Sequence, residues 1–277
     1  MCLAIVALNA HPRLPLVIAA NRDEFHSRDA APAHWWEEGV LAGRDLAGGG
    51  TWFGVTRNGR WALVTNFREG VPRDPDAPSR GRLVTHALAR NDAPLIGAAA
   101  IARDGWRYHG FNLLTGSVAI PRSRPFPGGR GETRESLRDY QGVAAHTSNR
   151  TSGAVALSCG IHGLSNHLLD TPWPKVVRSK ARIAADLARG TPDVAALFEL
   201  LEDRRQAEAS ALPSTGISSR WEQLLSSPFI VDAQYGTRCS TVLILDVGGH
   251  VRFVERSFDA EGNMTGEVAH EFALGAA

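Results

Sequence analysis

The sequence predicts an α+β fold in which β-sheets are sandwiched by helical layers, built as a single domain over residues 1–277. Three observations favour this class. Apolar, β-rich segments joined by short turns lie near both ends of the chain, and segments of helical periodicity lie between them. No shift in composition marks a domain boundary, and a length of 277 residues fits one large domain.

Two hairpins are predicted in the first quarter of the chain. Residues 2–8 and 15–20 are apolar and β-rich around a short polar turn, which is typical of a buried hairpin. Residues 52–57 and 61–66 flank Asn58-Gly59, a strong short-range hairpin signal. The glycines at 48–50 leave the backbone bare ahead of this second hairpin, which suits either a tight turn or a close approach of a ligand.

Helices are predicted at about 80–103, 175–188 and 192–201. The second begins at a proline and the third is expected to be capped by Thr191. Further strands are predicted near 108–115, 142–147 and 153–158, and a last hairpin at 240–247 and 251–254. Residues 121–136, rich in Pro, Gly and Arg, are predicted to be a surface loop.

Composition and charge exclude several functional classes. The net charge of +1 gives no electrostatic basis for binding nucleic acid or an anionic membrane. No apolar run reaches the 18 or so residues needed to span a bilayer. Three scattered cysteines do not form a disulfide framework, so the reducing cytoplasm is the expected compartment. Cys159 and His162 have a metal-like spacing, but no second pair accompanies them and no metal site is predicted.

Cys2 is the first candidate for chemistry. A small second residue permits removal of Met1, which would leave Cys2 with a free α-amino group. That amine has a reference pKa of about 7.7–8.0, so it could accept the thiol proton and act as the base for its own side chain. The alternative is that Cys2 is a small hydrophobic residue opening a buried strand.

Asn21-Arg22-Asp23-Glu24 follows the apolar strand at 16–20 and is the second candidate. Four polar residues at a strand end commonly form a solvated turn. In the functional interpretation, the end of the second strand lies beside the start of the first. Arg22 is then close enough to lower a thiol pKa, and an acidic neighbour could hold the amine or the substrate.

Polar residues in three other places are weaker candidates. Asn166, in a loop dense in small and polar residues, could donate its amide to an oxyanion, and Asn66 is a further amide candidate. Arg238, at the entry to an apolar strand, is a candidate second cation. Asn166 could equally lie in an ordinary helix-entry turn.

Taken together, these motifs resemble the NRDE family, also called the transport and Golgi organisation protein 2 family. The resemblance covers nearly the whole chain. It rests on Met1-Cys2, Asn21-Arg22-Asp23-Glu24-Phe25, the segment 49–54, Thr65-Asn66, the stretch 163–175, and Gly236-Thr237-Arg238-Cys239-Ser240-Thr241.

The resemblance implies a four-layer αββα fold of the N-terminal-nucleophile hydrolase type, related to bile salt hydrolases and penicillin V acylases. By position, Cys2 would be the nucleophile and Arg22 would lie beside its thiolate. Asn66 and Asn166 would form the oxyanion hole, and Arg238 would steady the site. In those acylases an acidic residue follows the arginine by three positions, where this chain has Phe25. Two alternatives follow: Asp23 or Glu24 substitutes for that residue, or the amidase machinery is incomplete. Substrate contacts are expected from Asn21, Glu24, Trp52 and His167.

Two functions remain open from the sequence, with a structural scaffold as a third and less supported one. The first is an amidohydrolase that cleaves a non-peptide acyl amide through Cys2 and needs no cofactor. The second is a non-catalytic carrier of haem or an acyl-CoA or lipid ligand, with a role in intracellular trafficking, because family members are associated with secretory organisation, haem movement and lipid metabolism. The candidate axial ligands for haem are His26, His34, His162 and His167.

Overall fold

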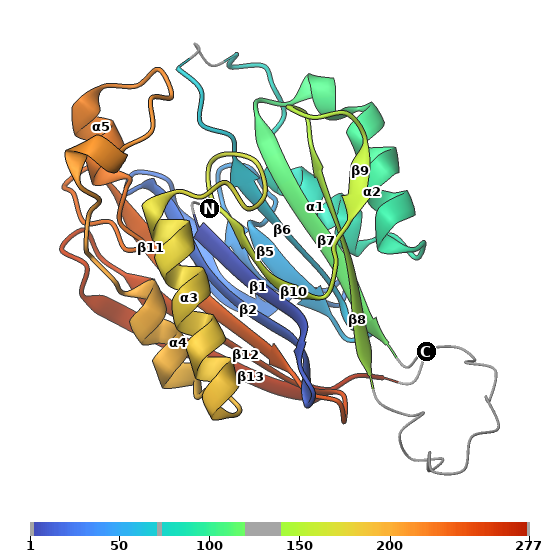
Figure 1. The fold of residues 1–277 in the computed structure, drawn as a ribbon. Coiled ribbons are helices and arrows are strands. Elements are labelled where there is room, and N and C mark those ends of the chain that lie inside the picture. Colours follow the sequence, from blue (N-terminus) through green and yellow to red (C-terminus); the bar gives the residue numbers. More distant parts are fainter. Residues whose placement is uncertain (1–2, 71–73, 120–139, 276–277) are drawn as a thin grey trace.

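A computed structural model describes residues 3–70, 74–119 and 140–275 and contains two antiparallel sheets packed face to face (Figure 1). The first sheet has the strand order β10 (Gly160–Leu164), β1 (Leu3–His11), β2 (Leu14–Phe25), β11 (Tyr235–Leu245), β12 (His250–Phe258) and β13 (Met264–Ala273). The second has the order β3 (Ala30–Trp35), β4 (Val40–Asp45), β5 (Phe53–Thr56), β6 (Arg60–Asn66), β7 (Phe111–Ala119), β8 (Gln141–Ser148) and β9 (Ala154–Ala156).

Helices cover the outer face of each sheet and complete four αββα layers (Figure 1). α3 (Pro174–Arg189) and α4 (Val194–Leu201) pack on the first sheet, whereas α1 (Gly81–Leu88) and α2 (Pro94–Arg103) pack on the second. α5 (Ser219–Leu224) lies near the end of the first sheet where β2 finishes. The four-layer α+β prediction is therefore confirmed.

Alternation along β1 explains why its sequence is continuously apolar from Leu3 to Leu8. Ala4, Val6 and Leu8 face the second sheet, while Leu3 and Ile5 face α3 and α4. Side chains of a strand alternate between faces, so a strand covered on both sides needs apolar residues at every position.

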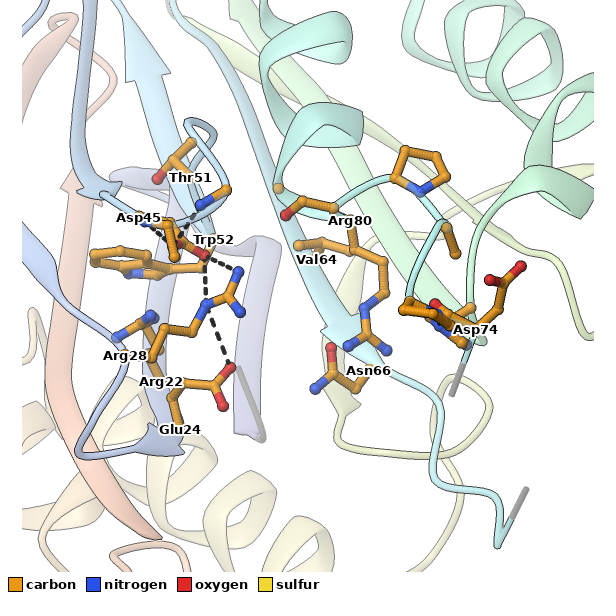
Figure 2. Close-up of a pocket in the computed structure, with 18 residues that line it drawn as sticks. Arg22, Glu24, Arg28, Asp45, Thr51, Trp52, Val64, Asn66, Asp74 and Arg80 are labelled. Carbon is orange, nitrogen blue, oxygen red and sulfur yellow. Dashed lines mark hydrogen bonds and ion pairs between the residues drawn. The ribbon is translucent and has the colours of Figure 1, made fainter. Parts of the chain in front are cut away.

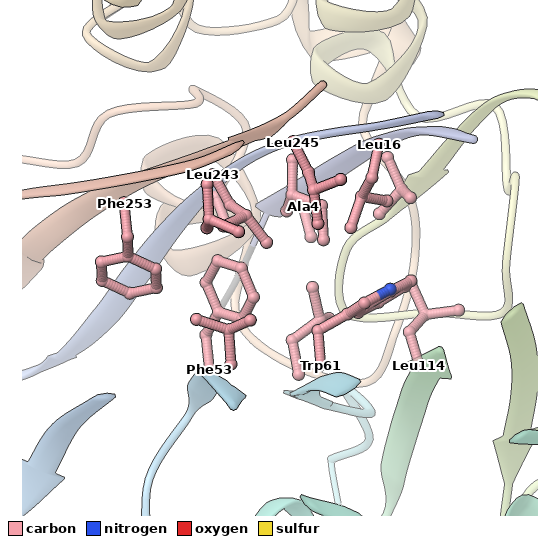
Figure 3. Packing of buried hydrophobic residues seen from close by; sticks show 14 of the residues in the cluster. Ala4, Leu16, Phe53, Trp61, Leu114, Leu243, Leu245 and Phe253 are labelled. Carbon is pink, nitrogen blue, oxygen red and sulfur yellow. The ribbon is translucent and has the colours of Figure 1, made fainter. Parts of the chain in front are cut away.

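The core between the sheets is filled by large side chains from both of them (Figure 3). The rings of Phe53 and Phe253 lie 5.6 Å apart between centroids and join the second sheet to the first. Trp61 is fully buried in the same cluster. Burying a side chain of this size stabilises the fold by roughly 1.5–3 kcal/mol, so this layer holds the two sheets in fixed relation.

The predicted hairpins are confirmed. β1 pairs with β2 from Leu3 opposite Asn21 onward, and β5 pairs with β6 around a turn in which Gly59 has φ +80°. Asn-Gly suits such a turn because its residues adopt left-handed backbone angles. The C-terminal hairpin of β11 and β12 is present as well, and its first strand pairs with β2.

The prediction of a single helix over 80–103 is wrong. The segment forms two helices, α1 and α2, separated at residues 89–93. Ala93 has an extended backbone (φ −59°, ψ 143°) because the ring of Pro94 disfavours the helical conformation in the residue before it. The cap of α4 is Asp193 rather than Thr191, since its carboxylate accepts the backbone N–H of Ala195 at 3.4 Å.

Four strands, namely β3, β4, β10 and β13, were not predicted. The predicted loop at 121–136 lies outside the described residues. In the ranges that the structure describes, no helix is long and apolar enough to cross a lipid bilayer.

Candidate functional site

The candidate site lies where β1 begins and β2 ends. Cys2 itself lies outside the described residues, but Leu3, to which it is bonded, pairs with Asn21. On its other side β2 pairs with β11, with Arg22 opposite Cys239 and Asp23 opposite Thr237. Sequence segments near residues 3, 22 and 238 therefore meet in adjacent strands.

Strand alternation divides the tetrapeptide Asn21–Glu24 between two faces. Arg22 and Glu24 line one cavity, while Asn21 and Asp23 lie on the other face and are fully buried. The amide of Asn21 donates to the carbonyls of Leu201 (2.8 Å) and Pro228 (2.9 Å). Its oxygen accepts from the hydroxyl of Ser240 at 2.6 Å. These bonds join β2 to α4, so Asn21 holds the strand end in place and does not line the cavity, where it had been predicted to bind substrate.

Asp23 is tied to β11 rather than exposed to the cavity. Its Oδ1 accepts the hydroxyl of Thr237 at 2.7 Å, and its backbone carbonyl accepts the hydroxyl of Tyr235 at 3.2 Å. Of the two acidic residues predicted to replace the acylase carboxylate, only Glu24 lines the cavity that Arg22 enters.

Arg22 is held by an aromatic contact. Arg22 is only 4% exposed, and its guanidinium carbon lies 4.4 Å from the centroid of the Trp52 ring. Such a cation–π contact stabilises by roughly 0.5–2 kcal/mol and fixes the plane of the guanidinium. Among the described residues, Nη1 of Arg22 has no hydrogen-bond partner. A buried donor of this kind is available to an anion or a carbonyl oxygen.

Trp52 owes its position to a glycine. A Cβ at Gly43 of β4 would lie 2.3 Å from the indole ring, so only glycine leaves room for the tryptophan there. Gly50 is similarly close to α1, because a Cβ there would lie 2.4 Å from the backbone carbon of Gly81. The glycine run thus lets the loop pack on the start of α1, which forms a wall of the cavity.

The cavity around Arg22 has a volume of about 470 Å³ and a charged lining. Figure 2 shows Arg22, Glu24, Arg28, Asp45 and Trp52 on one side, with Asn66, Asp74 and Arg80 on the other. Arg28 pairs with Asp45 at 2.8 Å and lies 4.0 Å from Glu24. The charged and titratable lining residues that sequence reasoning missed are Arg28, Asp45, Asp74, Arg80 and His109. The glycine run at 48–50 was the one sequence signal for the part of this cavity formed by the start of α1.

A second cavity of about 290 Å³ adjoins the first. Both are lined by Asn66, Arg80 and His109, so these residues mark the junction between them. The second cavity has an aromatic and aliphatic wall and also includes Asn166. We call the 470 Å³ cavity the polar cavity and the 290 Å³ cavity the aromatic cavity.

The two predicted oxyanion-hole residues meet at this junction. Asn66 ends β6, and Nδ2 of Asn166 donates to its backbone carbonyl at 3.2 Å. Oδ1 of Asn166 accepts from Arg68 at 3.5 Å, and its backbone carbonyl accepts the N–H of Arg68 at 2.7 Å. Because arginine can only donate, its position next to Oδ1 sets which way the amide is turned.

Arg68 is in turn fixed by a buried ion pair. Its Nη1 lies 2.7 Å from Glu222 of α5, and both side chains are under a tenth exposed. Glu222 also accepts from the backbone and hydroxyl of Thr215, at 2.8 and 2.6 Å. The guanidinium carbon of Arg68 stacks 4.7 Å from the centroid of Trp173. Asn166 is thus positioned by a network that sequence reasoning did not find, since its members are far apart along the chain.

Arg238 does not line the polar cavity. It lines a smaller cavity of about 230 Å³ that also includes Arg22 and Trp52. Its Nη1 donates to the backbone carbonyls of Phe25 (3.2 Å) and His26 (3.0 Å). Arg238 therefore holds the turn that follows β2, in keeping with a steadying role and not with direct contact in the polar cavity.

Two buried titratable residues, Cys239 and Glu255, line the smaller cavity together with Arg22. Glu255 accepts the backbone N–H of Ala33 at 2.8 Å and the hydroxyl of Thr241 at 3.0 Å, and burial raises its pKa. Burial also raises the pKa of the Cys239 thiol, with the nearby Glu255 adding to the effect. A buried thiol with a raised pKa is a poor nucleophile, so Cys239 is a structural cysteine.

His167 stands apart from both cavities, where it had been predicted to contact substrate. Its ring packs between Phe67 (4.9 Å) and Trp173 (5.7 Å), and Nδ1 bonds with the hydroxyl of Thr171 at 3.0 Å. Burial, followed by the charge of Arg68, lowers the pKa of His167. It serves as a packing residue beside Asn166.

The other histidines considered for haem also have partners. His26 bonds with the carbonyl of Asp232, His34 with that of Pro32, and His162 with Asp170, at 3.0, 2.8 and 2.9 Å. None of these lines the polar or the aromatic cavity. In the described ranges, no group of three or more side chains is placed to hold a metal ion.

These features define the class: an αββα protein with a polar cavity and an adjoining aromatic cavity at the paired ends of β1, β2 and β11. Residues 1–260 match the sequence model of the family described as Transport and Golgi organisation 2, and the chain belongs to that family.

Relatives in animals are similar over nearly their whole length. The Transport and Golgi organization 2 homolog of Mus musculus is 30% identical, and the alignment covers 94% of this chain and 92% of that protein. The homolog of Bos taurus is 34% identical over the same shares. The Drosophila melanogaster protein is 25% identical, covering 93% and 92%.

Solved structures are similar at low sequence identity. An N-acylethanolamine-hydrolyzing acid amidase ortholog of Caenorhabditis elegans has a TM-score of 0.47 at 10% identity, covering 88% of this chain and 92% of that one. A conjugated bile acid hydrolase from Clostridium perfringens has a TM-score of 0.44 at 7% identity, covering 100% and 98%.

Proposed function

We propose that this protein is an N-terminal cysteine amidohydrolase that cleaves a non-peptide acyl amide through Cys2 after removal of Met1. The observation that carries the proposal is the placement of Arg22. Arg22 lines the polar cavity and lies one residue beyond the Leu3–Asn21 pair, beside the residue to which Cys2 is bonded. A cation at this point favours a thiolate.

The proposed reaction uses the α-amine of Cys2 as its base. The amine takes the thiol proton, and Sγ attacks the amide carbonyl to form a tetrahedral intermediate. The C–N bond then breaks, the leaving amine takes a proton from the α-ammonium, and a thioester remains. The amine next accepts a proton from water as its oxygen attacks the thioester. Breaking the C–S bond then releases the carboxylic acid and restores the thiol.

Asn66 and Asn166 are proposed to stabilise the negative oxygen of both intermediates. Their meeting at the junction of the two cavities supports this role. Removing one donor of this kind slows a reaction by roughly 10²–10³-fold. Glu24 is proposed to orient the substrate amine, since it is the acidic residue of the tetrapeptide that lines the polar cavity.

The experiment compares Cys2→Ala and Cys2→Ser with Cys159→Ala, using a panel of N-acyl amides. Cys159 is exposed and lines none of the cavities described above, so it is the matched control. We expect loss of turnover with Cys2→Ala and normal turnover with Cys159→Ala. Intact mass of the wild type should lack Met1 and show a transient acyl adduct on Cys2. Equal turnover by Cys2→Ala and wild type would refute the proposal.

The alternative is a carrier that binds haem or an acyl-CoA or lipid ligand without turnover. The aromatic cavity supports an apolar ligand. For haem, none of the four histidines named above lines either cavity. Titration with haemin separates these cases: a Soret shift lost on substitution of one histidine would favour the haem carrier.

A further inference from the structure

The aromatic cavity has a wall made by three rings in a chain of edge-on contacts. Phe25 and Tyr235 lie 5.1 Å apart at 79°, and Tyr235 and Trp221 lie 5.6 Å apart at 81°. Phe25 follows Glu24 directly and pairs with Tyr235 across β2 and β11. The aliphatic residues Ile217 and Leu225 extend the same wall.

Two of the charged residues in this lining, Arg68 and Glu69, are neutralised by ion pairs. Arg68 is paired with Glu222 at 2.7 Å, and Glu69 is paired with Arg150 at 2.5 Å. Phe25 is 38% exposed, so its ring can be reached by a ligand. An apolar cavity with a few polar groups at one end is typical of a small-molecule site.

The polar groups of the aromatic cavity are gathered at one end. Asn66, Arg80 and His109 belong to both cavities, and Asn166 bonds with Asn66 at that junction. A substrate carbonyl at the junction would extend its two substituents into the two cavities. The apolar one fits the aromatic cavity, and the polar amine fits the cavity lined by Glu24, Asp45 and Asp74.

We infer that the aromatic cavity is the acyl subsite and that Trp221 is a specificity-determining residue for an apolar acyl group. This inference rests on the proposed function for the orientation of the amide. The wall is preformed: α5, which carries Trp221, is capped by Ser218 and anchored through the buried Glu222. A rigid wall selects by size because it does not adjust to the ligand.

The volume of the subsite sets the size of the acyl group. About 290 Å³ is roughly ten times the liquid volume of one water molecule, which leaves room for on the order of ten non-hydrogen atoms. Each buried methylene contributes about 0.8 kcal/mol, or about fourfold in affinity. Affinity should therefore rise with acyl length until the cavity is full and then level off.

The test is equilibrium binding of the straight-chain carboxylates butyrate, hexanoate, octanoate and dodecanoate to the full chain, measured by calorimetry. These are acyl products, so no turnover is needed. We expect a rise of about fourfold per methylene up to roughly octanoate. Trp221→Ala should weaken octanoate binding by at least about tenfold and butyrate binding much less. Trp106→Ala is the matched control, because Trp106 is 80% exposed and lines neither cavity.

Phe25→Ala is a second variant, used if Trp221→Ala does not fold, and should give the same selective loss. Binding that does not depend on chain length, or equal octanoate binding by Trp221→Ala and Trp106→Ala, would overturn the inference. Its failure is distinguishable from that of the proposed function. Binding that depends on chain length without amide cleavage would support the acyl subsite and refute the hydrolase. Amide cleavage that does not depend on acyl length would support the hydrolase and refute the acyl subsite.

Discussion

The guanidinium carbon of Arg22 lies 4.4 Å from the centroid of the Trp52 ring, and this contact joins the two sheets at the polar cavity. Arg22 is on β2 of the first sheet, while Trp52 directly precedes β5 of the second. The cation is therefore placed by the packing of one sheet on the other. If Arg22 serves the thiol of Cys2, its removal should have a chemical effect that ordinary packing residues lack.

Arg22→Leu is expected to slow alkylation of Cys2 by iodoacetamide by about tenfold near pH 6. Loss of a neighbouring cation raises a thiol pKa by about 1–3 units, which lowers the thiolate fraction at a fixed pH. The measurement is the pH profile of Cys2 alkylation, followed by peptide mass. Arg44→Leu is the control, because Arg44 stacks 4.8 Å from Trp36 but lies outside the polar cavity. Superimposable profiles for wild type and Arg22→Leu would contradict the role.

Arg68→Met is expected to lower the free energy of unfolding by about 3–5 kcal/mol, because Glu222 would stay buried without its cation. The double variant Arg68→Met, Glu222→Gln should recover much of the loss, since no isolated charge remains. Urea unfolding measures both. As a comparison, Arg252→Met breaks an exposed pair with Glu271 and should change stability by less than about 1 kcal/mol. Equal effects of Arg68→Met and Arg252→Met would show that burial of the first pair is unimportant.

Acid should weaken the fold partly through His146. Burial lowers the pKa of His146 to about 4, while an unfolded histidine titrates near 6.5. Between these values the unfolded chain binds a proton that the folded chain does not. The free energy of unfolding therefore keeps its full value with respect to His146 above pH 6.5. It falls by about 3 kcal/mol in all as the pH drops from 6.5 toward 4.

Urea unfolding at pH 7.5 and pH 4.5 of wild type and His146→Gln tests this, and the variant should lose less stability on acidification. His250→Gln is the control because the side chain of His250 is 74% exposed. If His146→Gln and wild type lose the same stability between the two pH values, the titration of His146 is not responsible.

Gly50→Ala is expected to destabilise the protein by about 1–3 kcal/mol, because the new Cβ would meet the backbone of Gly81 at 2.4 Å and neither segment can yield easily. Thermal unfolding measures the effect. Gly266→Ala provides the control, since a Cβ there meets nothing within 4 Å. A melting temperature for Gly50→Ala equal to that of Gly266→Ala would mean that the contact relaxes freely.

Local patterns predicted the central elements well. The first hairpin and the Asn58-Gly59 turn follow from apolar periodicity and turn chemistry, which act over a few residues. Periodicity also indicated sheets covered by helices, whereas the four-layer αββα class came from the family resemblance. β3 and β13, which both lie at sheet edges, were missed. β13 is largely exposed, so burial does not impose an apolar pattern on it.

The tetrapeptide Asn21–Glu24 shows where sequence reasoning stops. Alternation along a strand separates Arg22 and Glu24 from Asn21 and Asp23, and this was available from the sequence. Which pair faces a cavity depended on what packs against each side, namely α4 and the segment near Pro228 on one face and Trp52 on the other.

The sequence by itself determined the strands around the site, the family motif and the candidate nucleophile, since each is a property of neighbouring residues. Only the tertiary structure decided that Arg80, His109 and Asn66 stand between two cavities, and that Arg68 turns Asn166 through a glutamate on α5. Arg68 and Glu222, for example, are more than a hundred residues apart in the sequence. Such pairings are set by how the sheets and helices pack, and no local periodicity encodes them.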